Sequence, residues 1–91
     1  MPRITRKQLD TLEQRLNNAL GRPVEAYTDS GAQIGNIHLQ GANGGYNVHE
    51  MHNSGGGVRG LAYGLTAREA YQWLNGALVA LQLANGADVS R

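Results

Sequence analysis

The chain has no cysteine and no phenylalanine, and its positive and negative charges nearly cancel. Because cysteine is absent, neither a disulfide nor a thiolate zinc site can hold the fold together. With only four tyrosines and one tryptophan, the core must come mainly from leucine, isoleucine, valine and alanine. The formal net charge of +1 falls short of the positive excess that dedicated nucleic-acid-binding proteins usually carry.

A long apolar run is also lacking. No apolar segment follows the opening "MPRITRKQLD", so the sequence predicts no signal peptide. The longest apolar stretch, "GALVALQLA", is too short and too interrupted to span a bilayer. We therefore expect a soluble, cytoplasmic protein with no membrane partner, folded as a single domain over residues 1–91.

The leucine spacing predicts a first helix over residues 6–20. Four leucines recur at three- and four-residue intervals and so share one helical face: Leu9, Leu12, Leu16 and Leu20. Thr5 and Gln8 have the spacing of a capping box at its start. Gly21 can end the helix in the left-handed conformation.

The middle of the chain shows the period-two alternation of half-buried strands. Three segments carry it, at about residues 23–28, 34–40 and 45–52. Ile34 and Gly35 fall out of phase with the second segment, which predicts a bulge there. The glycine-rich segment "NSGGGVRGLAYG" is expected to be a flexible connection with a short extended piece over 58–63.

A hairpin is predicted between the second and third strands. Asn43-Gly44 is the strongest short hairpin signal in the chain. A turn at these residues sets the register of the pairs that follow: Ala42 with Gly45, Gln40 with Asn47, Leu39 with Val48 and His38 with His49. In this register the apolar residues lie on one face and the histidines on the other, as expected of a real hairpin.

A second helix is predicted over residues 67–84. Thr66 and Glu69 form a second capping box, and Asn85-Gly86 is expected to end the helix before a frayed tail, "ADVSR". The order is then helix, three-stranded antiparallel sheet, helix (α-β-β-β-α). We expect an α+β two-layer domain with both helices on the apolar face of the sheet.

The second helix is apolar on more than one face. Its core stripe uses Leu74, Leu78 and Leu81, but Val79 and Leu83 fall on the far side. Since a surface helix in a monomer has a polar back, a second apolar face indicates a partner, most simply another copy of the chain. The alternative is a helix buried more deeply than two layers allow. The residues expected to mediate homodimerisation are Trp73, Val79, Ala80 and Leu83.

The histidines and glycines around the hairpin form a candidate ligand site. Its members are His38, His49, Gly55, Gly56 and Gly57. A metal would need further ligands, and Glu50 points to the opposite face in the predicted register, so a solvent-facing histidine pair without a metal is favoured. The chain has no Walker loop and no Gly-x-Ser-x-Gly elbow, and its carboxylates are scattered. We therefore predict no catalytic residue, no cofactor and no enzymatic activity.

Basic residues offer a second hypothesis, a small nucleic-acid-binding module. The candidate contacts to nucleic acid or another anion are Arg3, Arg6, Lys7, Arg59 and Arg68. The helix–three strands–helix order is similar to that of double-stranded-RNA-binding domains, which grip phosphates with a basic cluster at the start of the last helix. This chain offers only Arg68 there, in "TAREAY". The module would bind with an affinity that falls steeply with salt.

Two longer blocks, "HLQGANGGYNVHEMHNSGGGVRG" and "TAREAYQWLNGALVAL", carry a further resemblance. They resemble small uncharacterised proteins encoded by phages and prophages, over roughly residues 34–82. The resemblance implies a cytoplasmic accessory protein that acts by binding a host or phage protein, and it brings no active-site residues with it. A non-enzymatic, homodimeric interaction protein is thus our leading expectation, with nucleic-acid binding and ligand or metal binding as alternatives.

Overall fold

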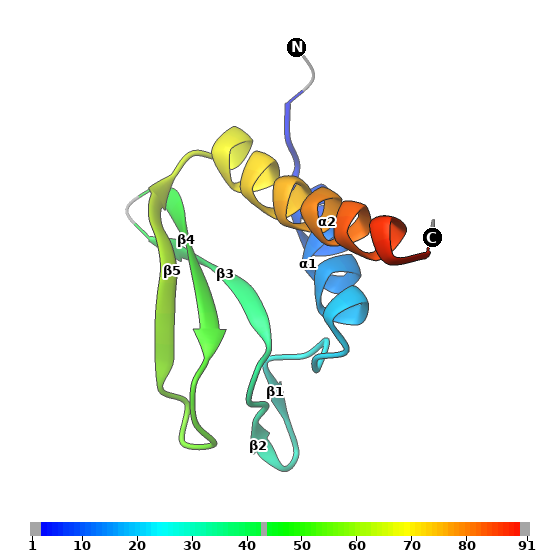
Figure 1. Ribbon diagram of the computed structural model, residues 1–91. Coiled ribbons are helices and arrows are strands. Elements are labelled where there is room, and N and C mark those ends of the chain that lie inside the picture. Colours follow the sequence, from blue (N-terminus) through cyan, green and yellow to red (C-terminus); the bar gives the residue numbers. More distant parts are fainter. Residues whose placement is uncertain (1–2, 43, 90–91) are drawn as a thin grey trace.

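The chain folds into two helices, a three-stranded antiparallel sheet and a separate two-stranded hairpin (Figure 1). The computed structural model describes residues 3–42 and 44–89. In chain order the elements are α1 (Arg6–Leu20), β1 (Tyr27–Thr28), β2 (Gly31–Ala32), β3 (Ile37–Ala42), β4 (Gly45–Met51), β5 (Val58–Leu65) and α2 (Ala67–Val89). The main sheet has the order β3-β4-β5. The predicted α+β class is therefore confirmed.

The core lies between the two helices and one face of the main sheet. Apolar side chains of α1, α2, β3 and β4 form one buried cluster: Leu9, Leu12, Leu16, Ile37, Leu39, Val48, Ala70, Leu74 and Leu78. Because Ile37, Leu39 and Val48 share one face of the hairpin, both helices cover that face. Among the residues that the structure describes, no helix is long and apolar enough to cross a membrane.

Helix α1 begins and ends where the sequence predicts. The Thr5 backbone N–H donates to Gln8 Oε1 over 2.8 Å, and the Gln8 N–H donates to Thr5 Oγ1 over 3.2 Å. Together these bonds form the predicted capping box. Gly21 takes the left-handed conformation with φ 71° and closes the helix.

The β3–β4 hairpin has the predicted register. His38 pairs with His49, and Leu39 pairs with Val48. Of the predicted turn, Asn43 lies outside the described residues. The predicted bulge is also present. The Gly35 N–H donates to the Met51 carbonyl and the Met51 N–H donates to the Asn36 carbonyl, so two residues on this side face one residue of the opposite strand.

Two predictions about the strands are wrong. Of residues 23–28, only β1 is a strand, and it pairs with β2 instead of joining the main sheet. The third strand of the main sheet is β5; the extended piece predicted over 58–63 falls within it, but it is a paired strand of the sheet and not part of a flexible connection. Leu61, Ala62 and Leu65 of β5 pack against the core, and this burial offsets the low strand propensity of the neighbouring glycines. Register shifts in the β4–β5 ladder accommodate the extra residues of β5.

Helix α2 starts with the predicted capping box but runs past its predicted end. The Glu69 N–H donates to Thr66 Oγ1, and the Thr66 N–H donates to Glu69 Oε1. The helix continues through Asn85-Gly86 to Val89, so residues 87–89 of the predicted tail are helical. Alanines on both sides of the stop signal favour the helix and outweigh a single glycine. Ser90 and Arg91 lie outside the described residues.

Candidate functional site

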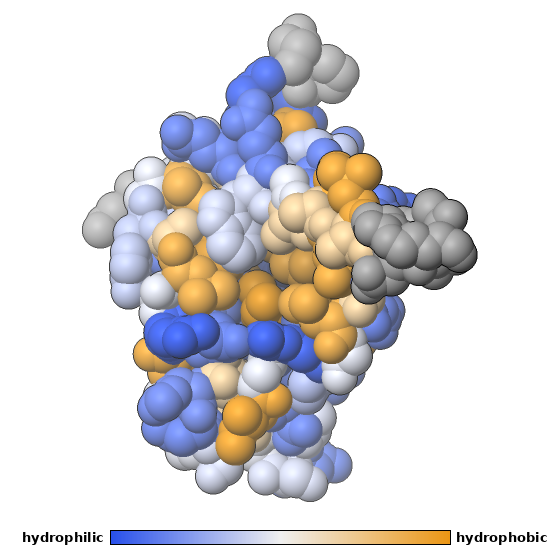
Figure 2. Space-filling view, in the orientation of Figure 1, coloured by the Kyte–Doolittle hydropathy of each residue, from blue (hydrophilic) through white to orange (hydrophobic). Residues whose placement is uncertain are grey.

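Helix α2 exposes an apolar stripe on the side away from the core. Its members, spaced at three and four residues, are Gly76, Val79, Ala80 and Leu83, which we call the α2 outer stripe. The side chains of Val79 and Leu83 are 43% and 69% exposed. Figure 2 shows apolar surface gathered over α2. The alternative of a more deeply buried helix is thus not realised in a single copy of the chain.

Trp73 differs from the other three residues predicted for self-association. It is partly buried and packs against the core cluster, whereas Val79, Ala80 and Leu83 are exposed. The small residues Gly76 and Ala80 are one helical turn apart on the outer stripe. A Cβ placed on Gly76 would meet no atom within 4 Å, so the helix surface is open there.

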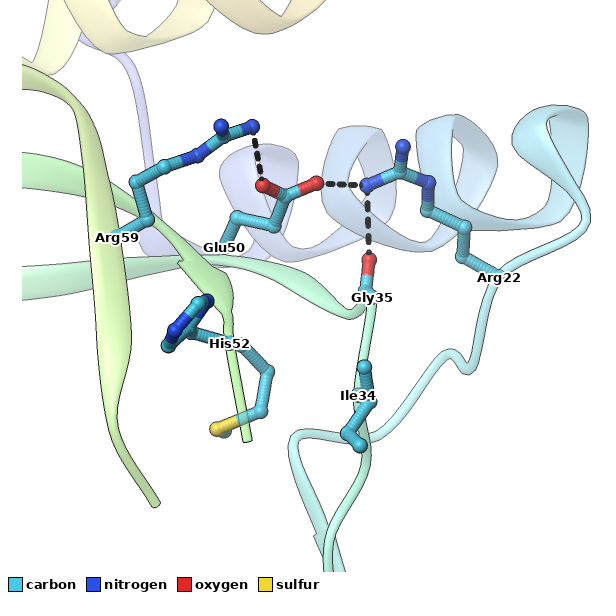
Figure 3. Close-up of a pocket in the computed structure, with 7 residues that line it drawn as sticks. Arg22, Ile34, Gly35, Glu50, His52 and Arg59 are labelled. Atoms are coloured by element: carbon cyan, nitrogen blue, oxygen red, sulfur yellow. Dashed lines mark hydrogen bonds and ion pairs between the residues drawn. The ribbon is translucent and has the colours of Figure 1, made fainter. Parts of the chain in front are cut away.

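A polar cluster beneath α2 joins three segments of the chain (Figure 3). Glu50 of β4 accepts hydrogen bonds from Arg22 Nη1 and, at 2.6 Å, from Arg59 Nη2 of β5. Arg22 Nη1 also donates to the Gly35 carbonyl over 3.2 Å. The hydrogen bond from Arg22 and the nearby charge of Arg59 hold the pKa of Glu50 below its ordinary value. The carboxylate is therefore kept ionised between the two guanidinium groups.

This cluster forms one side of a hollow of about 270 Å³. The lining residues, which include three basic side chains and two apolar ones, are Arg22, Ile34, Gly35, Glu50, Met51, His52 and Arg59. Of these, only Arg59 is predicted from the sequence to contact an anion. Charge along the chain could not reveal the site, because the partners meet only once β5 pairs with β4 and Arg22 folds back over them.

The predicted histidine pair lies on the sheet face opposite the helices. The rings of His38 and His49 meet edge to face with centroids 5.7 Å apart. The ring of Tyr63 in β5 also lies edge to face with the His49 ring, with centroids 6.4 Å apart. His49 is only 9% exposed, so the expectation of a solvent-facing pair is wrong for this residue. Its Nδ1 is buried without a hydrogen-bond partner among the described residues. Burial, and secondarily the charge of His49, lower the pKa of His38.

The glycines of the candidate ligand site are held in an ordered turn. Asn53 Oδ1 accepts hydrogen bonds from the backbone N–H groups of Gly55 and Gly57, both over 3.0 Å. Gly56 lies beside the Tyr27 hydroxyl, where a Cβ would approach to 3.2 Å. Asn53 thus already accepts from two of the backbone N–H groups that a ligand of this loop would use. The described part of the chain holds no group of three or more His, Asp or Glu placed to bind a metal ion.

The basic residues predicted to contact nucleic acid are spread over several elements. They are Arg3 before α1, Arg6 and Lys7 on α1, Arg59 on β5 and Arg68 on α2. Arg6 pairs with Asp10 at 2.9 Å and with Glu13 at 3.4 Å, and Arg59 pairs with Glu50. Two of the five positive charges therefore already have carboxylate partners within the chain.

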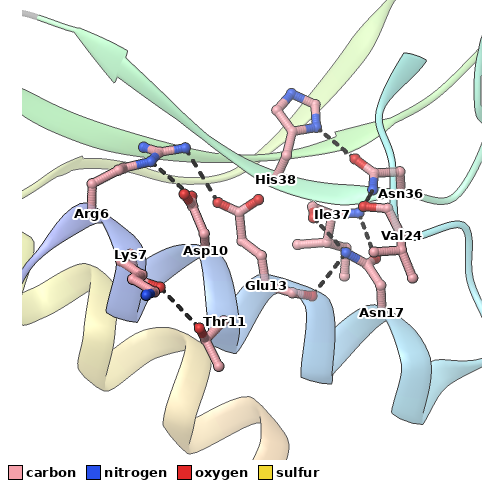
Figure 4. A network of polar contacts seen from close by, with 10 residues as sticks. All are labelled: Arg6, Lys7, Asp10, Thr11, Glu13, Asn17, Val24, Asn36, Ile37 and His38. Atoms are coloured by element: carbon pink, nitrogen blue, oxygen red, sulfur yellow. Dashed lines mark hydrogen bonds and ion pairs between the residues drawn. The ribbon is translucent and has the colours of Figure 1, made fainter. Parts of the chain in front are cut away.

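A second polar network joins α1 to the outer edge of β3 (Figure 4). Asn17 is fully buried, and its amide bonds to both backbone groups of Ile37. Nearby, burial raises the pKa of Glu13 to about 7, although a hydrogen bond from the Leu39 backbone and the charge of Arg6 act in the opposite direction. This network fastens α1 to the sheet and was not predicted from the sequence.

No model of a known protein family, no curated protein sequence and no solved structure matches this chain. No function is therefore carried over from a relative. The α2 outer stripe and the hollow beside Glu50 are the surface features considered below as sites for a partner or ligand.

Proposed function

We propose that the protein is a non-enzymatic interaction module that forms a homodimer through the α2 outer stripe. The observation that carries this proposal is the exposure of Val79 and Leu83 on a helix whose opposite side already packs on the core. Fully burying an exposed side chain of this size is worth about 1.5–3 kcal/mol, and Val79 and Leu83, which are 43% and 69% exposed, would each gain a part of that. In a twofold dimer, the Val79 and Leu83 side chains of both copies would be buried at the interface, which favours a stable dimer.

The absence of charge along α2 favours a second copy of the chain as the partner. Residues 70–85 contain no charged side chain. In a twofold interface, a charge near the axis would face its own copy and be repelled, so an uncharged stripe is suited to self-association. Gly76 and Ala80 support this choice, because small residues let two helices approach closely.

A second step of this proposal rests on the sequence resemblance alone. We propose that the dimer acts in the host cytoplasm as an accessory protein that binds a host or phage protein. Arg6 and Arg59 each form an ion pair with a carboxylate of the chain, so their positive charges are partly neutralised. This supports a protein partner over nucleic acid.

Light scattering coupled to size-exclusion chromatography tests the dimer. We expect twice the chain mass of 9.8 kDa for the unmodified protein, and the single chain mass for the double variant Val79→Glu/Leu83→Glu. The matched control is Gln14→Glu/Asn18→Glu, which adds the same charge at the same spacing on the exposed side of α1. This control should remain dimeric, and far-ultraviolet circular dichroism should show that both variants are folded.

A monomeric unmodified protein, or a dimeric double variant, would contradict the proposed interface. If the purified protein instead carries bound nucleic acid that high salt removes, the interaction-module proposal is wrong and nucleic-acid binding takes its place.

A further inference from the structure

The hollow beside Glu50 carries one surplus positive charge. Two guanidinium groups, Arg22 and Arg59, share a single carboxylate. Each guanidinium has more N–H groups than these bonds use, and its planar fork is suited to gripping a second carboxylate-like group. Their neighbour His52 also lines the hollow.

The guanidinium groups are held in position before any ligand arrives. Arg22 is fixed by the Gly35 carbonyl and by Glu50, whose own side chain is only 17% exposed. Arg59 is held by the same carboxylate although its side chain is 66% exposed. A ligand would therefore not have to order two long side chains, and a pre-organised site binds at a lower entropic cost.

The hollow also has an apolar side. Ile34 lines it below the row of charged groups, as the close-up in Figure 3 shows, and Met51 also lines it but is only 1% exposed. Ile34 is 60% exposed, so the domain gains little from its side chain in the free state. An exposed apolar side chain beside fixed, partly unused donors is the composition of a small-ligand site, where apolar walls surround a few placed polar groups.

We infer that this hollow binds one carboxylate that carries an apolar substituent. Its single negative charge would match the surplus charge of the Arg22–Glu50–Arg59 cluster, and its substituent would lie against the exposed side chain of Ile34. A phosphate dianion would exceed that surplus and leave the apolar wall unused. The carboxylate could belong to a free small acid or to the C-terminus of a peptide that ends in an apolar residue. No residue of α2 lines the hollow, so the inference is independent of the proposed dimer.

Titration of the isotope-labelled full chain, followed by NMR, tests the inference. Hexanoate should shift the amide signals of Gly35, Met51 and His52. Acetate, which lacks the apolar substituent, should bind more weakly, and hexanamide, which lacks the charge, should not bind. Arg59→Gln should weaken hexanoate binding by about tenfold or more, because a charge-assisted hydrogen bond is lost.

The matched control is Arg68→Gln, which removes an exposed arginine at the start of α2 and should leave the affinity unchanged. Ile34→Ser is a second variant that leaves the ion pairs intact, and it should bind hexanoate no better than acetate. Dispersed NMR signals will show that each variant is folded. A peptide ending in Leu with a free carboxylate, compared with its amide, distinguishes the sources. Tighter binding of the acid form than of hexanoate indicates a chain terminus, and the reverse order indicates a small acid.

Four results would overturn the inference. Three are comparisons: equal losses of hexanoate affinity in Arg59→Gln and Arg68→Gln, equal affinity for hexanoate and hexanamide, and binding of dimethyl phosphate as tight as that of hexanoate. The last would assign the hollow to a phosphodiester. The absence of any hexanoate-induced shift would also reject it.

Discussion

Asn17 fastens α1 to the edge of the sheet, and its removal should be the most damaging polar substitution in the described chain. Its Oδ1 accepts from the Ile37 N–H over 2.9 Å, and its Nδ2 donates to the Ile37 carbonyl over 2.8 Å. The same Nδ2 donates to the Glu13 carbonyl over 2.9 Å. Asn17 is 0% exposed and Ile37 is 5% exposed, so water cannot replace these bonds without a rearrangement.

The expected loss of stability follows from the groups that Asn17→Ala leaves unpaired. The N–H and the carbonyl of Ile37 both lose their partner, and each unsatisfied buried group costs about 1–3 kcal/mol. We therefore expect the free energy of unfolding to fall by about 3–4 kcal/mol. In a domain of this size, that loss corresponds to a decrease in Tm of roughly 15–25 °C.

Urea and thermal unfolding followed by circular dichroism measure this loss. Protein concentration must be the same for each variant, because dimerisation makes the apparent stability depend on it. Asn18→Ala, at an exposed neighbouring position of α1, is the matched control and should change the unfolding free energy by less than about 0.5 kcal/mol. Asn17→Asp keeps the acceptor for the Ile37 N–H but loses the donor to its carbonyl, so it should also destabilise. Equal stabilities of Asn17→Ala and Asn18→Ala would refute the reasoning.

Two further predictions concern α1. The pKa of Glu13 rises from 4.5 to about 7 on folding, so its contribution to stability is present below about pH 4.5 and is lost as the pH rises through about 7. This loss is of the order of 3 kcal/mol. Glu13→Gln should abolish most of the difference in unfolding free energy between about pH 5 and pH 8, measured by urea unfolding. A pH dependence unchanged by Glu13→Gln would contradict the burial of this carboxyl. Gly21→Ala should cost about 1 kcal/mol through its φ of 71° alone, since no atom lies within 4 Å of the added Cβ. Gly21→Asn should recover part of this loss in the same assay.

Local signals predict α1 and the β3–β4 hairpin closely. The bounds of α1 depend on a capping box, a leucine periodicity and a C-terminal glycine, all within a short window of sequence. The hairpin register is likewise set by adjacent residues, because the alternation of apolar residues around Asn43-Gly44 allows only one pairing that buries Leu39 and Val48 together.

The same reasoning fails at β5 and at β1. The glycines of β5 make it look unlike a strand in the sequence. It is a strand because Leu61, Ala62 and Leu65 pack against the core and because its backbone pairs with β4. Strand preference depends on burial and cross-strand neighbours more than on the residues themselves. Residues 23–26 show the converse case, since their apolar alternation predicts a strand but the Pro23 and Val24 carbonyls accept from the Asn36 side chain instead of a neighbouring strand.

The sequence by itself determined the secondary-structure pattern of α1, the hairpin and the start of α2, and it placed Val79 and Leu83 on one outer helical face. These features arise from side chains a few residues apart, whose spacing follows directly from helix and strand geometry. Only the tertiary structure decided that Asn17 meets Ile37 and that Arg22 and Arg59 meet at Glu50. These contacts depend on how α1 packs on the sheet and on which strand pairs with β4. Docking and pairing are set by burial of the whole core, and a local pattern of residues does not encode them.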